Sequence, residues 1–146
     1  MTAWFVAFGD DGSPSRWWDI FTTPGFRHCF AFRYDLATDC WIVVDPARGG
    51  LIVTPMANEA FNLHISGLAP ALSRVVRCDF RDNRRRLPTI LGWCAPVCAD
   101  LVRFRGLALT PRRLYCCLVR NGAEPAFEGV CRYAATRESE RGDGDR

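Results

Sequence analysis

The chain has 146 residues, of which 49% are hydrophobic and 24% are charged. This size and balance predict one compact domain with a proper core, and we expect no second domain. All 19 basic residues are arginine, and the net charge of +3 is too modest to indicate a binding surface by itself. We expect the domain to occupy residues 1–133, with a disordered polar C-terminal tail over 134–146.

The N-terminal sequence MTAWFVAFGDDG lacks the basic and apolar regions of a signal peptide. No stretch approaches the roughly 20 apolar residues of a membrane span. We therefore expect a soluble, unprocessed protein. Without a secretory signal, its eight cysteines are expected to be reduced thiols, most of them buried as small hydrophobic residues. Cys29, Cys40, Cys116 and Cys117 lie inside apolar runs, which fits that interpretation.

Strand signals come first in chain order, as aromatic and β-branched runs bounded by turn residues. They predict strands at 4–8, 26–34, 40–46, 51–54 and 73–80. A brief helical segment is expected at RWWDIF, whose Trp17 and Trp18 either pack on the core, which we favour, or line a groove. Residues 58–64 form a short helix or an irregular crossing, and the chain becomes less regular after Gly122.

Two short helices are predicted between Trp93 and Gly122. Pro96 fits the first position of a helix that ends at Gly106, with Asp100 in its opening turns. This phasing puts Cys98 in the first turn, where the helix dipole favours a thiolate, and leaves Cys94 before the helix. Thr110 and Pro111 announce a second helix that closes at Asn121 and Gly122.

The runs FRHCFAFRY and CWIVVDP form the strongest pair of strand signals, and the short DLATD between them predicts an antiparallel hairpin. A two-residue loop would set His28 opposite Asp45, Phe30 opposite Val43 and Phe32 opposite Trp41. A four-residue loop would leave His28 and Asp45 diagonal on the same face of the sheet. An odd loop would put Asp45 on the opposite face.

These residues suggest a nucleophilic site. A thiolate needs a base and a group that orients the base, and His28 with Asp45 could supply both to Cys98. His64 lies in a weakly patterned segment and is the poorer base. Each residue also has an ordinary structural explanation, because buried cysteines pack in cores and aspartate before proline commonly forms a turn.

Two other uses of the sequence are less favoured. Cys94 and Cys98 with His28 or His64 could bind zinc, but the paired short cysteine spacings of structural zinc sites are absent. The arginine cluster RDNRRR could bind nucleic acid, but it is short and lacks interleaved aromatics, so a solvated loop explains it better. We expect no metal, no other cofactor and no nucleic-acid partner.

The order PGFRHCFAF, WIVVDP, then a cysteine at a helix start followed by LTPRRLYCCL resembles small phage and prophage proteins. Through them, residues 17–118 resemble the papain-like cysteine hydrolases of the NlpC type, in the circularly permuted branch where histidine precedes cysteine. The resemblance implies an α+β fold with an antiparallel sheet packed on a short helix pair. It implies Cys98 as nucleophile, His28 as base and Asp45 as the orienting residue.

The sequence thus predicts a cysteine hydrolase or acyltransferase, peptidase-like or amidase-like, with a peptide, amide or ester substrate. The resemblance makes cell-wall peptides plausible substrates and implies a cytoplasmic or virion-associated location. The alternative is a non-catalytic phage or prophage accessory protein that uses the same fold to bind virion proteins.

Overall fold

We describe a computed structural model of the chain, which defines residues 3–10, 22–47, 50–79, 93–104 and 106–128. Within them, six strands form one antiparallel sheet in the order β4-β3-β2-β1-β5-β6. The strands are β1 (Trp4–Gly9), β2 (His28–Asp35), β3 (Cys40–Ala47), β4 (Gly50–Met56), β5 (Leu72–Cys78) and β6 (Glu124–Glu128). The described helices are α1 (Asn58–Leu68), α2 (Cys94–Leu101) and α3 (Pro111–Arg120). The predicted α+β class is confirmed.

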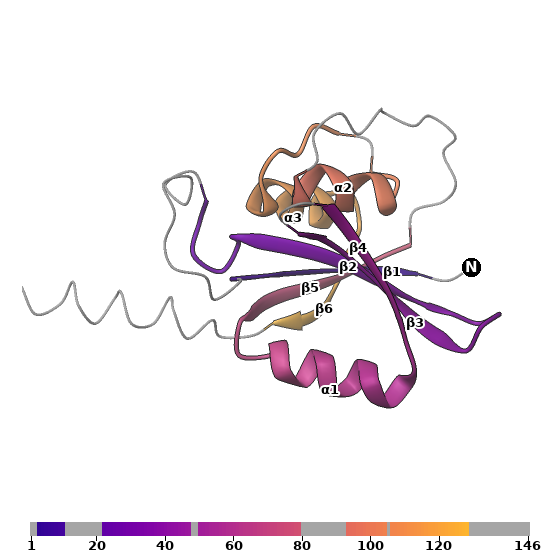
Figure 1. Ribbon diagram of the computed structural model, residues 1–146. Helices are drawn as coiled ribbons and strands as arrows, with labels where there is room; N and C mark the ends of the chain where they lie inside the picture. Colours follow the sequence, from indigo (N-terminus) through magenta and orange to yellow (C-terminus); the bar gives the residue numbers. More distant parts are fainter. Residues whose placement is uncertain (1–2, 11–21, 48–49, 80–92, 105, 129–146) are drawn as a thin grey trace, which may run out of the picture.

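The sheet forms the middle of three layers, with α1 on one face and with α2 and α3 on the other (Figure 1). The central strands are therefore buried on both sides, and successive residues alternate between two cores. Along β2, Cys29 and Ala31 pack toward α2 and α3, whereas Phe30 and Phe32 pack toward α1. This double burial explains why β1 and β2 are continuous apolar runs rather than alternating ones.

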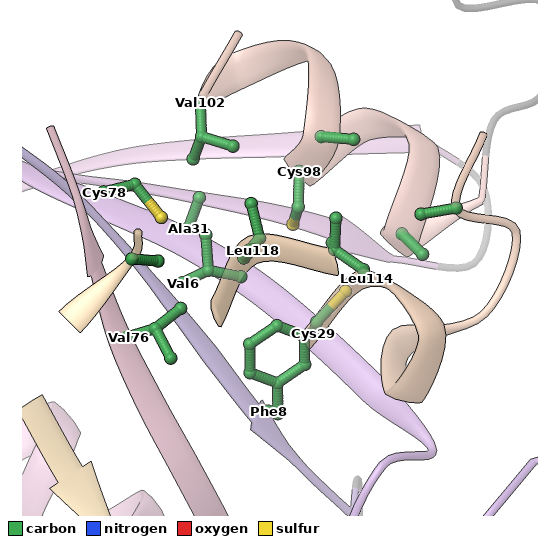
Figure 2. Close-up of a cluster of buried hydrophobic side chains, with 14 residues drawn as sticks. Val6, Phe8, Cys29, Ala31, Val76, Cys78, Cys98, Val102, Leu114 and Leu118 are labelled. Carbon is green, nitrogen blue, oxygen red and sulfur yellow. The ribbon is translucent and has the colours of Figure 1, made fainter. Parts of the chain in front are cut away.

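The core between the sheet and the helix pair holds the largest fully buried side chains (Figure 2). Phe8 lies against Phe26 and Tyr115, with ring centroids 5.9 and 5.6 Å away. Leu114 and Leu118 of α3 enter the same core and have no exposed surface. This core fixes the helix pair over β1, β2 and β5.

Two sequence predictions about these elements need correction. The helix predicted from Pro96 begins at Cys94 and ends at Leu101, with Trp93 as its N-cap residue. Pro96 is thus the third helical residue, a position at which its missing N–H still costs no intrahelical bond. Within the described part of the chain after Gly122, which was predicted to be less regular, Glu124–Glu128 pairs with β5 as the edge strand β6.

Other predicted boundaries agree more closely. Helix α3 begins after Thr110, whose side chain accepts a hydrogen bond from the Arg113 N–H. It ends at Arg120, with Asn121 as the C-cap residue, next to the predicted close at Asn121 and Gly122. The segment from Asn58 is a full helix that runs to Leu68. No described helix has the length and apolar character needed to cross a membrane. The predictions for Trp17 and Trp18, for the arginine cluster at 81–86 and for the tail at 134–146 lie outside the described residues.

Candidate active site

The entry to β2 is held by a buried polar cluster that fixes where His28 begins the strand. The Asp10 carboxylate accepts a hydrogen bond from the Gly25 N–H at 2.9 Å, and the Arg27 N–H donates to the Gly9 carbonyl at 3.0 Å. Ser73 donates from β5 to the carbonyls of Phe8 and Gly25. These bonds tie the turn before His28 to the ends of β1 and β5.

Gly9 is the β1 partner of His28, and this position requires glycine. A Cβ atom there would lie 2.3 Å from the Ala71 carbonyl oxygen, well inside van der Waals contact. The close approach lets the end of β1 pair with both His28 and Leu72. The histidine is therefore placed on a constrained part of the backbone.

Asp45 of β3 contacts His28 directly. The His28 Nε2 and Asp45 Oδ1 atoms are 2.7 Å apart, and the two side chains are 24% and 40% exposed. Strands β2 and β3 pair Ala31 with Val44 and Asp35 with Cys40, so their connecting loop has four residues. Continuing this register past Ala31 leaves His28 and Asp45 diagonal, as the four-residue alternative predicts. The two-residue loop, with Phe32 opposite Trp41, is wrong because Phe32 pairs with Val43.

The third side chain at this place is Cys94, the first residue of α2. Its sulfur lies close enough to the His28 ring and to the Cys29 thiol to interact with both. The residue is half-buried against the core below it. A cysteine, a histidine and an aspartate from three separate elements thus form one chain of contacts.

These contacts make Cys94 acidic. The hydrogen bond from the Cys29 thiol is the largest influence; with the hydrogen bond and charge of His28 it outweighs burial and lowers the pKa of Cys94 to about 5. Burial opposes the charge on His28, but the hydrogen bonds to Asp45 and Cys94 prevail and raise the pKa of His28 to about 10. Between these values the pair is a thiolate and an imidazolium.

Cys98 does not occupy the helix-start position predicted for the nucleophile. Because α2 begins at Cys94, Cys98 is the fifth helical residue rather than a first-turn residue, so its predicted place at the helix start is wrong. Its side chain has no exposed surface and points into the core (Figure 2). Cys94 was not predicted as the nucleophile because Pro96 was assigned to the first helical position, which left Cys94 before the helix.

The remaining candidates lie elsewhere. His64 belongs to α1, on the face of the sheet opposite α2 (Figure 1). Cys116 is exposed, and Cys40 and Cys117 are half-buried, so the predicted burial holds for Cys29 but not for these three. Among the described residues, no group of three or more His, Cys, Asp or Glu side chains is arranged to hold a metal ion.

The backbone at the start of α2 adds hydrogen-bond donors to the site. Trp93 has the extended conformation of an N-cap residue, but its side chain makes no capping bond. The first intrahelical bond at this end runs from the Val97 N–H to the Trp93 carbonyl. Because Pro96 has no N–H, the Cys94 and Ala95 N–H groups are the helical donors that precede that bond.

Comparison of the chain with protein-family models, curated proteins and solved structures finds no match. The geometry of the side chains therefore carries the functional argument.

Proposed function

We propose that the protein is a cysteine hydrolase or acyl-transfer enzyme whose nucleophile is Cys94. The observation that carries the proposal is the position of His28, which bonds to the Asp45 carboxylate and interacts with the Cys94 sulfur. Thiol-based acyl transfer requires a nucleophile, a proton-transfer group next to it, and an acid that orients the proton-transfer group. Cys98 was the residue predicted for this role, and its burial argues against it.

In the proposed reaction, the Cys94 thiolate attacks the carbonyl carbon of an amide, peptide or ester. The His28 imidazolium donates its proton to the leaving nitrogen or oxygen as the carbonyl–heteroatom bond breaks. The neutral imidazole then takes a proton from water, or from an acceptor alcohol or amine, as the acceptor's oxygen or nitrogen attacks the acyl carbon. The carbon–sulfur bond breaks, which releases the acyl product and restores the thiolate and the imidazolium. Asp45 holds the ring through Nε2, which leaves Nδ1 for proton transfer at the sulfur.

The Cys94 and Ala95 N–H groups support the same proposal. A carbonyl carbon attacked by the sulfur would carry its developing negative oxygen close to the start of α2. Two N–H donors and the positive end of the helix dipole stabilise charge at such a place. The Trp93 side chain does not cap these donors.

We also propose that the domain has a permuted papain-like core of the NlpC type. A cysteine at a helix start, packed on an antiparallel sheet after a histidine strand, supports this assignment. Cell-wall peptide substrates and a phage or prophage setting remain predictions from the resemblance.

Acylation by p-nitrophenyl acetate tests the proposal without knowledge of the natural substrate. We expect a burst of nitrophenolate and an acetyl group on Cys94, located by peptide mass spectrometry. Cys94→Ser and His28→Ala should abolish the burst, whereas Cys116→Ser, which removes an exposed thiol, should retain it. Acetylation spread evenly over the thiols, or a burst that survives His28→Ala, would favour the non-catalytic accessory protein.

A further inference from the structure

Four cysteines form a continuous series from the candidate site into the core. Cys94 is half-buried, whereas Cys29, Cys98 and Cys78 are buried. The Cys29 thiol lies close enough to Cys94 and to Cys98 to interact with both, and Cys98 lies close enough to Cys78 to interact electrostatically. Figure 2 shows Cys29, Cys78 and Cys98 in the same layer between the sheet and the helix pair.

Within this series, Cys94 and Cys29 have complementary positions. Cys94 begins α2 and keeps some exposed surface. Cys29, on β2, has no exposed surface and interacts with that sulfur. A reactive thiolate next to a second thiol is the arrangement found where oxidation stops at a disulfide instead of continuing to sulfinic acid.

We propose that Cys94 and Cys29 form a reversible oxidative modification site, in which a peroxide converts the pair to a disulfide and switches off the nucleophile. This inference rests on the proposed function, because it takes Cys94 to be the reactive thiolate. It adds a role for Cys29, which takes no part in the acyl-transfer steps themselves. Cys98 lies one helical turn deeper and contacts Cys29 rather than Cys94, so it is not the partner.

The chemistry balances with hydrogen peroxide as the oxidant. The Cys94 thiolate attacks one peroxide oxygen, the O–O bond breaks, and Cys94 becomes a sulfenic acid while hydroxide leaves and is protonated to water. The Cys29 sulfur then attacks the Cys94 sulfur, and the departing hydroxide takes the Cys29 proton and leaves as a second water. The two sulfurs lose two electrons in total, and an external dithiol returns them by thiol–disulfide exchange.

The two steps should differ in speed. Cys94 is a thiolate at neutral pH, so its oxidation begins readily. Burial raises the pKa of Cys29 well above the ordinary range, so its attack as a thiol is slow. The proximity of the two residues, which pack in the same core cluster, compensates because the second step is intramolecular. We therefore expect a transient sulfenic acid followed by the disulfide.

The experiment treats the full chain with one equivalent of hydrogen peroxide, blocks remaining thiols and maps the products. Trypsin places Cys29 in residues 28–33 and Cys94 with Cys98 in residues 87–103, and fragment ions distinguish the last two. We expect a crosslink between Cys29 and Cys94, together with loss of p-nitrophenyl acetate reactivity that dithiothreitol restores. This mapping needs no variant and is independent of any folding defect.

Matched variants then test which thiol resolves the sulfenic acid. In Cys29→Ala, the loss of p-nitrophenyl acetate reactivity caused by peroxide should become largely irreversible. The fraction of reactivity that dithiothreitol restores should be several-fold lower in Cys29→Ala than in Cys98→Ala, with each variant measured against its own untreated reactivity. Cys94 oxidised to sulfinic acid in the wild type, or linked to Cys98, would overturn the inference while leaving Cys94 acylation intact. Absence of Cys94 acylation before any peroxide is added would instead overturn the proposed function.

Discussion

At the scale of single residues, the charge of Asp45 decides how strongly His28 holds its proton. Asp45→Asn keeps the side-chain shape but removes the charge that faces Nε2. We expect the pKa of His28 to fall from about 10 toward its ordinary value of 6.5. The chain has two histidines, so imidazole NMR signals can be assigned with a His64→Gln variant. An unchanged titration of His28 in Asp45→Asn would contradict this role for Asp45.

At the scale of elements, the start of α2 lacks a side-chain cap from Trp93, and its N–H groups are the proposed donors to the substrate oxygen. Serine at position 93 would accept a hydrogen bond from the Ala95 N–H, because Pro96 offers none. Trp93→Ser should therefore raise the free energy of unfolding, by about 0.5–2 kcal/mol relative to Trp93→Ala. It should also slow the p-nitrophenyl acetate burst more than Trp93→Ala does, because the cap occupies a donor meant for the substrate. Equal rates in the two variants would argue against Ala95 as a donor.

The end of β1 offers a second test at this scale. Gly9→Ala would force a Cβ against the Ala71 carbonyl, so we expect it to lower the free energy of unfolding by roughly 1–3 kcal/mol and to weaken Cys94 acylation. Gly67→Ala is the matched control, since its Cβ on α1 meets open space. That substitution should stabilise the protein by about 0.5–1 kcal/mol. Urea unfolding measures both, and equal effects would contradict the close approach at Gly9.

At the scale of the whole molecule, the Cys94–His28 pair links stability to pH. The lowered pKa of Cys94 contributes stability that is present above about 9 and lost as the pH falls through about 5. The raised pKa of His28 contributes stability that is present below 6.5 and lost as the pH rises through about 10. From 6.5 to 9 the folded and unfolded chains bind equal numbers of protons at this pair, so its contribution is flat.

The prediction is a plateau with a decline on each side. It is measured as the difference in free energy of unfolding between the wild type and the double variant Cys94→Ala, His28→Ala across pH 5–10. The subtraction removes the titration of groups remote from the pair. A difference that changes steadily through the neutral range would contradict the ion pair.

Much of this architecture follows from local sequence. The Thr110–Pro111 cap and the apolar runs of β1, β2 and β3 specify their elements directly, and the parity of the hairpin loop brings His28 and Asp45 to one face. The phase of α2 does not follow, because proline is tolerated at several positions of a first turn. That two-residue difference decides whether Cys94 or Cys98 meets the histidine. Strand β6 was missed because its short run, EPAFE, is defined by pairing with β5 rather than by its own pattern.

The central claim is that His28 and Cys29 hold Cys94 as a thiolate, and the rate of its alkylation against pH tests this most directly. Iodoacetamide labelling of Cys94, followed by mass spectrometry, should rise with a midpoint near pH 5. At pH 6 the gain in thiolate outweighs its weaker nucleophilicity, so labelling should exceed that of an ordinary thiol on the order of tenfold. In His28→Ala the midpoint should move upward by at least one pH unit, to about 6 or above. A wild-type midpoint in the range of ordinary thiols, unchanged by His28→Ala, would contradict the account.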